Sequence, residues 1–141
     1  MNGIVVGSVD WSDGEFVHAL ETCTLPSSCF RHGDHLRFAW LCMHAAPLEM
    51  AVNRVRYAIQ EYVAHLGHTS LFHETITAGW VRLIASHSEE HFETFLATNE
   101  ARLNKDLLHR FWSPELLASS RAKTEWVEPD REPLPLPYQS H

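Results

Sequence analysis

The sequence predicts an all-α fold: a single-domain, compact bundle of five to seven helices with an extended proline-rich C-terminal tail. Apolar residues recur at spacings of three and four through most of the 141 residues, as on the buried faces of helices. No segment alternates apolar and polar residues as a half-buried strand would, and no repeat of 20–50 residues is present. A chain of this length, with 45% hydrophobic and 21% charged residues, suits one domain spanning residues 1–141 that needs no disulfide framework.

The first expected helix follows an N-terminal arm, residues 1–11, which has no partner strand in view and which we expect to be loose. Ser12 and the acid after it offer an N-cap, and apolar residues then keep helical spacing through about Glu21. Residues 22–28 contain β-branched residues and a proline, and they predict a loop. Asp34 is expected to cap the second helix.

The third expected helix has the clearest pattern. Pro47 suits its first turn, where the missing N–H costs nothing, and Gly67 lies where a C-terminal glycine would let the chain turn through positive φ. The apolar residues between them repeat at three and four: Leu48, Ala51, Val52, Val55, Ala58, Ile59, Tyr62, Val63 and Leu66.

Further helices are expected over residues 72–86, after an N-cap at Ser88, after Asn99 and its following glutamate, and after Ser113. Four prolines then force residues 127–141 into an extended tail. Leucines alternate with these prolines, which leaves open whether the tail packs over a functional site.

The net charge of −7 argues against nucleic acid as a partner, because phosphate binding needs clustered cations. No apolar run is long enough for a membrane span, and no basic segment of a signal peptide begins the chain. The three cysteines, Cys23, Cys29 and Cys42, are odd in number and lack CxxC spacing. They therefore predict reduced thiols in a cytoplasmic protein. A homodimer is left open.

Eleven histidines are many for this length, and two groups of them stand out. His32 and His35 lie where a loop enters a helix, so their imidazoles could converge, and His73-Glu74 opens another helix. Imidazole is the commonest metal ligand. On a regular helix His73 and Glu74 point about 100° apart, whereas His73 and Thr77 share a face. The easier arrangement therefore has His73 as a ligand, with Glu74 bonding a backbone N–H or orienting a ring.

Simpler interpretations compete with a metal site. An isolated histidine at a helix start is more often a partly buried side chain with one hydrogen bond, and short patterns recur by chance. Residues 87–91 match the inverted zinc-protease pattern HxxEH, but Ser88 would cap a helix inside it, so we interpret the match as chance. Cys29 with His32 and His35 would supply three zinc ligands and would need a fourth from elsewhere.

Three strings of the chain resemble a family of small bacterial all-α proteins: His-Gly-Asp-His-Leu-Arg-Phe-Ala-Trp over 32–40, Phe-His-Glu-Thr-Ile-Thr over 72–77, and Phe-Trp-Ser-Pro-Glu-Leu-Leu over 111–117. The resemblance implies a shared small helical fold and a common histidine-containing site, without a substrate or a reaction. It departs at Phe72 and at 111–112, where the family favours tyrosines. The positions that match the family's motifs, and to which the resemblance assigns the common site, are His32, His35, Arg37, Trp40, His73, Glu74 and Thr77.

The leading functional prediction is a small metal-dependent enzyme acting on a small-molecule substrate, with His35 and His73 as ligands and His32 or Glu74 completing the shell. A bound Fe, Cu or Zn ion suits these donors. Two histidines with one carboxylate would indicate iron and oxygen chemistry, and an all-histidine set would indicate zinc or copper.

Around this centre, Arg37 is predicted to anchor an anionic group, although it lies about 200° round the helix from His35 and need not face the same pocket. A buried Arg37 would need a carboxylate partner such as Asp34 or Glu74. Thr77 and Trp80 are expected to shape the pocket.

Trp40 is assigned to the pocket as well, with plain core packing as its alternative.

Two other functions stay open. One is a metal-free enzyme with His73 or His35 as general base and Glu74 orienting it. The other is a non-catalytic helical ligand-binding or accessory protein, in which the histidines only cap and pack.

Overall fold

The computed structural model describes residues 4–138, and in that range the predicted all-α fold is confirmed, with no strand. Three 3₁₀ turns, η1 (Ser27–Cys29), η2 (Thr69–Leu71) and η3 (Lys105–Arg110), lie between the helices. The helices are α1 (Asp13–Glu21), α2 (His32–Ala45), α3 (Leu48–His65), α4 (Glu74–Ile84), α5 (Phe92–Asn99), α6 (Pro114–Leu117) and α7 (Ser120–Thr124).

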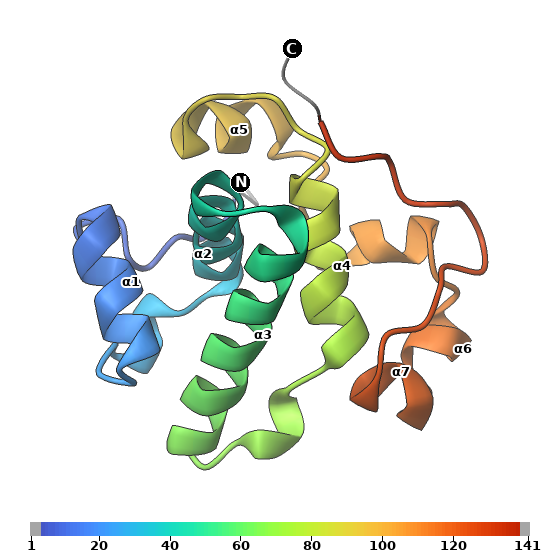
Figure 1. The fold of residues 1–141 in the computed structure, drawn as a ribbon, viewed down its shortest axis with the longest axis horizontal. Helices are drawn as coiled ribbons and strands as arrows, with labels where there is room; N and C mark the ends of the chain where they lie inside the picture. The colour runs from blue at the N-terminus through green and yellow to red at the C-terminus, as the bar shows by residue number, and fades with distance from the viewer. Residues whose placement is uncertain (1–3, 139–141) are drawn as a thin grey trace.

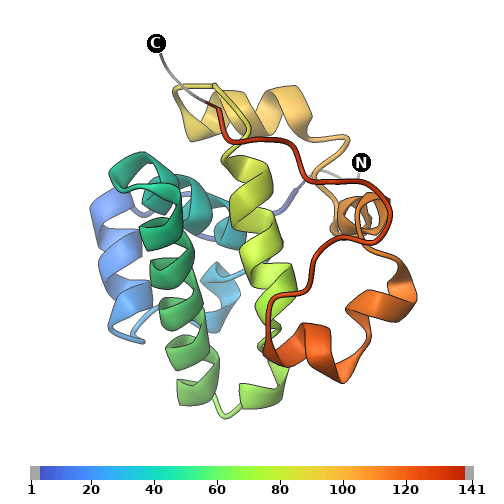
Figure 2. The same ribbon diagram turned by 45° about the vertical axis from the view of Figure 1, so that its right-hand side comes forward.

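Helices α2, α3 and α4 form the centre of the bundle, each in contact with the other two. Helix α1 packs on α3, whereas α7 and η3 pack on α4 (Figure 1). Helix α5 lies across one end, and the last described residues run back along the outside of α4 toward it (Figure 2). None of the helices in the described range is long and apolar enough to cross a membrane.

The ends of three helices follow the predicted chemistry. Ser12 caps α1 by accepting from the backbone N–H of Glu15, whose carboxylate accepts from the N–H of Ser12 in return. After α3 the chain turns at Gly67, where φ is +79°. Ser113 caps α6 as predicted, with Pro114 at the first helical position.

Other boundaries differ from the prediction. Helix α2 begins at His32, and Asp34 lies inside its first turn because its carboxylate serves the preceding chain, as described below. Helix α4 begins at Glu74 rather than 72 because the imidazole of His73 acts as its N-cap.

The predicted caps at Ser88 and Asn99 are both wrong. Helix α5 follows an N-cap residue at His91, and Asn99 is the last residue of that helix. The side-chain amide of Asn99 donates to the carbonyl oxygen of Phe95 instead of capping a new helix.

The expectation of a loose N-terminal arm is wrong for residues 4–11; residues 1–3 lie outside the described range. The N–H of Gly33 donates to the carbonyl of Val5 at 2.9 Å, and Ser8 is completely buried. Buried polar groups need partners. The arm therefore packs as part of the domain.

The tail is extended, as predicted, from Val127 to residue 138; residues 139–141 lie outside the described range. Backbone hydrogen bonds from Arg131 to the carbonyl of Phe111 and from Tyr138 to that of Ala85 hold it against the body.

Candidate functional site

A cavity of about 650 Å³ lies among α2, α3 and α4, with η3 and α6 closing one side. Its floor is apolar and comes mainly from the faces that these helices turn toward one another. Because this volume falls within the range of small-molecule sites, about 300–1,000 Å³, the cavity is the candidate site. The buried floor residues are Ala39, Val55, Ile59, Tyr62, Val63, Trp80, Val81, Leu108 and Leu117.

Polar side chains line the cavity above this floor. Half-buried histidines come from the start of α2, the start of α4 and η3, and Thr77 stands one turn into α4. The exposed side chains of Arg31 and Asp106 lie at the edge. The histidines are His32, His35, His73 and His109.

Both ring nitrogens of His73 are engaged. Nδ1 accepts from the backbone N–H of Ile76 at 3.1 Å, and Nε2 lies 2.8 Å from the carbonyl oxygen of Leu117. A carbonyl can only accept, so the ring donates to Leu117 from Nε2 while Nδ1 accepts from Ile76. The sequence predicted a metal ligand at this position; in the structure the side chain joins α4 to α6.

The two histidines of α2 also lie on the cavity wall. Nε2 of His32 lies 2.7 Å from the carbonyl oxygen of Leu103, and its ring meets the ring of Trp80 edge-on, with centroids 5.1 Å apart. The ring of His35 stacks on Phe30 with centroids 4.2 Å apart. The imidazoles therefore have defined orientations.

The described side chains of the cavity do not assemble a set of metal ligands. Among the described residues no three histidine, cysteine, aspartate or glutamate side chains are arranged to hold a metal ion, which includes the Cys29–His32–His35 set. A metal at His73 would have to replace either the cap of α4 or the hydrogen bond to Leu117.

Glu74, predicted to complete the metal shell or to orient a catalytic base, does neither in this arrangement. It is buried, and both carboxylate oxygens accept from Nε of Arg56, at 2.8 and 3.0 Å. Glu74 does not line the cavity. The two neighbours therefore face different surroundings, His73 toward Leu117 and Glu74 toward Arg56.

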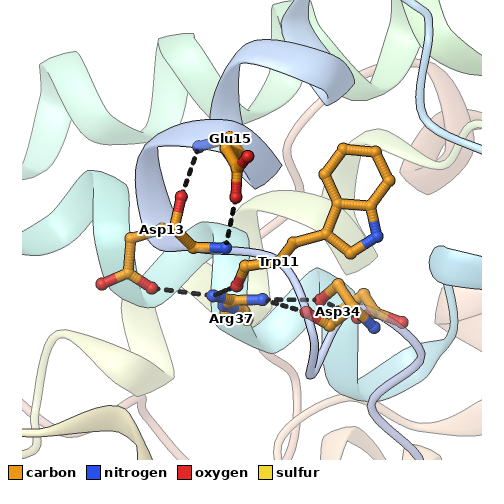
Figure 3. A network of polar contacts seen from close by, with 7 residues as sticks. Trp11, Asp13, Glu15, Asp34 and Arg37 are labelled. Carbon is orange, nitrogen blue, oxygen red and sulfur yellow. Dashed lines mark hydrogen bonds and ion pairs between the residues drawn. The ribbon is translucent and has the colours of Figure 1, made fainter.

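Arg37, predicted to anchor an anionic group, does not line the cavity. Its guanidinium is almost fully buried and donates to the carbonyl and hydroxyl of Ser8, to the carbonyl of Trp11 at 2.8 Å and to the carboxylate of Asp13 at 2.9 Å (Figure 3). Its carboxylate partner is thus Asp13, whereas the sequence had suggested Asp34 or Glu74.

Asp34 completes this network from the first turn of α2. Its fully buried carboxylate accepts from the N–H groups of Gly7, Ser8 and Arg31 and from the hydroxyl of Ser8. Arg37 and Asp34 together hold the N-terminal segment against the helix that carries His32 and His35.

The predicted pocket residues separate into two groups. Thr77 and Trp80 line the cavity. Trp40 does not: its ring packs against Phe95, with centroids 4.9 Å apart, and against His44, so it belongs to the core.

Sequence reasoning missed Arg31, Asp106 and His109 as cavity residues. Asp106 and His109 are three apart, a spacing that places both on one side of a short helical turn. A helix was expected to follow Asn99, but only its apolar stripe was considered, and the element found there is the 3₁₀ turn η3. Arg31 directly precedes His32, but no role was predicted for Arg31 from the sequence.

Tyr62 lines the floor with its ring and sends its hydroxyl to the carbonyl of Leu25 at 2.7 Å. Burial raises the pKa of this phenol.

Comparison of the chain with protein-family models, with curated proteins and with solved structures finds no match. The family resemblance noted in the sequence therefore stays a prediction.

Proposed function

We propose that this protein binds a small, largely apolar molecule in the cavity among α2, α3 and α4. The observation that carries the proposal is the cavity itself: about 650 Å³ of space with an apolar floor and a few oriented polar groups above it. Ligand sites combine a mainly apolar wall with a few fixed hydrogen-bonding groups in this way.

The hydrogen bonds of His32 and His73 to backbone carbonyls support binding more directly than catalysis. Each imidazole is held by a backbone group, which preorganises the wall. The metal-free acid–base enzyme predicted from the sequence would use Glu74 to orient His73 or His35, and Glu74 is instead paired with Arg56 and does not line the cavity.

Binding of the neutral fluorophore N-phenyl-1-naphthylamine tests this proposal. The wild-type protein should bind it at one saturable site with enhanced emission. Thr77→Trp, which places a large ring in the cavity, should weaken binding at least about tenfold, because it removes volume that the ligand needs. Met50→Trp, at an exposed position of α3 outside the cavity, is the matched control and should bind as wild type does. Wild-type affinity in a folded Thr77→Trp protein would overturn the proposal.

A metal-dependent enzyme is the second candidate, favoured by His32, His35 and His73 lining one cavity. Elemental analysis of untagged protein and of the His35→Ala/His73→Ala double variant separates the two. A near-stoichiometric Fe, Cu or Zn that is lost in the double variant would support this candidate. No metal in either protein after anaerobic reconstitution would exclude it.

We further infer a cytoplasmic location. Its support is that Cys23, Cys29 and Cys42 are all free thiols.

A further inference from the structure

We propose that the ligand of this cavity is an amphipathic monocarboxylate, with its apolar body on the floor and its single carboxylate at Arg31. This inference rests on the proposed binding function and adds the chemical class of the ligand. It comes from the charged groups around the cavity and from how the other arginines are used.

The chain has nine arginines, and eight of their guanidinium groups hydrogen-bond to a carboxylate, a side-chain amide or a backbone carbonyl. The guanidinium of Arg31 makes no hydrogen bond or ion pair with any residue that the structure describes, and it lies at the edge of the cavity. The backbone of Arg31 is fixed, because its N–H donates to the buried carboxylate of Asp34 at 2.7 Å.

A guanidinium presents parallel N–H donors in a plane, which match the two oxygens of a carboxylate. Asp106 is the only acid among the described residues that line the cavity, and no ion pair joins it to Arg31. Arg31 is the only arginine or lysine among the described residues that line the cavity, so it is the cation that this lining offers to an anion.

The rest of the site limits the ligand to one charge. Leucine, valine, isoleucine and tryptophan side chains form the floor, where a second charged group would lose its hydration without a partner. Since the whole chain carries −7, its overall field repels anions, and recognition of a carboxylate requires a local cation such as Arg31.

The test compares decanoate with 1-decanol, which share an apolar chain and differ in charge. The affinity of each compound is measured by displacement of N-phenyl-1-naphthylamine from the wild-type protein, from Arg31→Gln and from Arg121→Gln. Arg121 is an exposed arginine of α7, outside the cavity, and serves as the matched control. An apolar cavity alone favours decanol, because burying a carboxylate without a partner is unfavourable.

We expect decanoate to bind the wild type at least about tenfold more tightly than decanol, and to lose this advantage in Arg31→Gln but not in Arg121→Gln. Raising the salt concentration should weaken the binding of decanoate and leave the binding of decanol unchanged. Equal or tighter binding of decanol to the wild type, or a preference for decanoate that survives in Arg31→Gln, would overturn the inference while leaving the binding function intact. If neither compound nor the fluorophore binds, the proposed function fails and this inference with it.

Discussion

The imidazole of His73 donates from Nε2 to the backbone carbonyl of Leu117, 2.8 Å away, and thereby joins the start of α4 to the end of α6. The other ring nitrogen caps α4 at Ile76. One side chain therefore connects two elements that line the same cavity.

His73→Ala should lower the free energy of unfolding by about 1–3 kcal/mol, because it removes a helix cap and a partly buried hydrogen bond. His73→Asn should lower the free energy of unfolding by less, because asparagine is a good N-cap and can still cap α4. Its side chain is too short to replace the hydrogen bond to Leu117. Urea unfolding of the three proteins measures both effects. Unchanged stability in His73→Ala would show that these hydrogen bonds contribute little.

Gly33 of α2 lies directly against the N-terminal segment. A Cβ at this position would overlap the carbonyl oxygen of Val5 and lie 2.6 Å from Cγ2 of Val6. Gly33→Ala should therefore destabilise the protein by about 1–3 kcal/mol, as overpacking does.

Gly14 provides the matched control, because a Cβ there meets nothing within 4 Å. Gly14→Ala in α1 should be neutral or stabilising by up to about 1 kcal/mol, since alanine has the higher helix propensity. The midpoint temperature of thermal unfolding should fall in Gly33→Ala and stay the same or rise in Gly14→Ala. Equal shifts would contradict the close packing of the segment.

Asp34→Asn should cost about 2–4 kcal/mol, because a buried carboxylate that accepts several hydrogen bonds is replaced by a group carrying donors of its own. Hydrogen exchange at the Ser8 amide should accelerate as the segment detaches. Asp13→Asn is the control: its side chain is 69% exposed, so its ion pair with Arg37 should contribute less than about 1 kcal/mol. Slow exchange at Ser8 in Asp34→Asn would contradict this anchoring role.

The thiols should differ in reactivity. Burial raises the pKa of Cys42 to about 11, whereas Cys23 and Cys29 are partly exposed. At pH 8 an aromatic disulfide reagent should modify two thiols of the native protein rapidly and the third only after unfolding. Rapid modification of all three would show that Cys42 is accessible in the native state.

The same shift predicts a loss of stability in alkali. A folded-state pKa above the unfolded value of 9.0 means that the contribution of Cys42 is complete below pH 9 and is lost as the pH rises through about 11. The raised pKa of Tyr62 acts in the same direction. Urea unfolding from pH 8 to 11 should show a steeper loss in the wild type than in Cys42→Ala. Parallel profiles would mean that the pKa of Cys42 is the same in the folded and the unfolded protein.

The sequence predicted α3 well because a long amphipathic pattern ends in a glycine, and local geometry alone decides both features. It also selected His32, His35 and His73, which the fold brings to one cavity. It misjudged Arg37 and Trp40, because the direction of a side chain on α2 depends on which element packs there.

By itself, then, the sequence determined the all-α class, the main helices and the region of the site, since periodicity, caps and turns are local properties. Only the tertiary structure decided that residues 4–11 are held by Asp34 and Arg37, that His73 bonds to Leu117, and that Arg31 rather than Arg37 lies at the cavity. Each of these depends on contacts between residues far apart in the chain, and a helical period carries no information about the partner that a side chain meets.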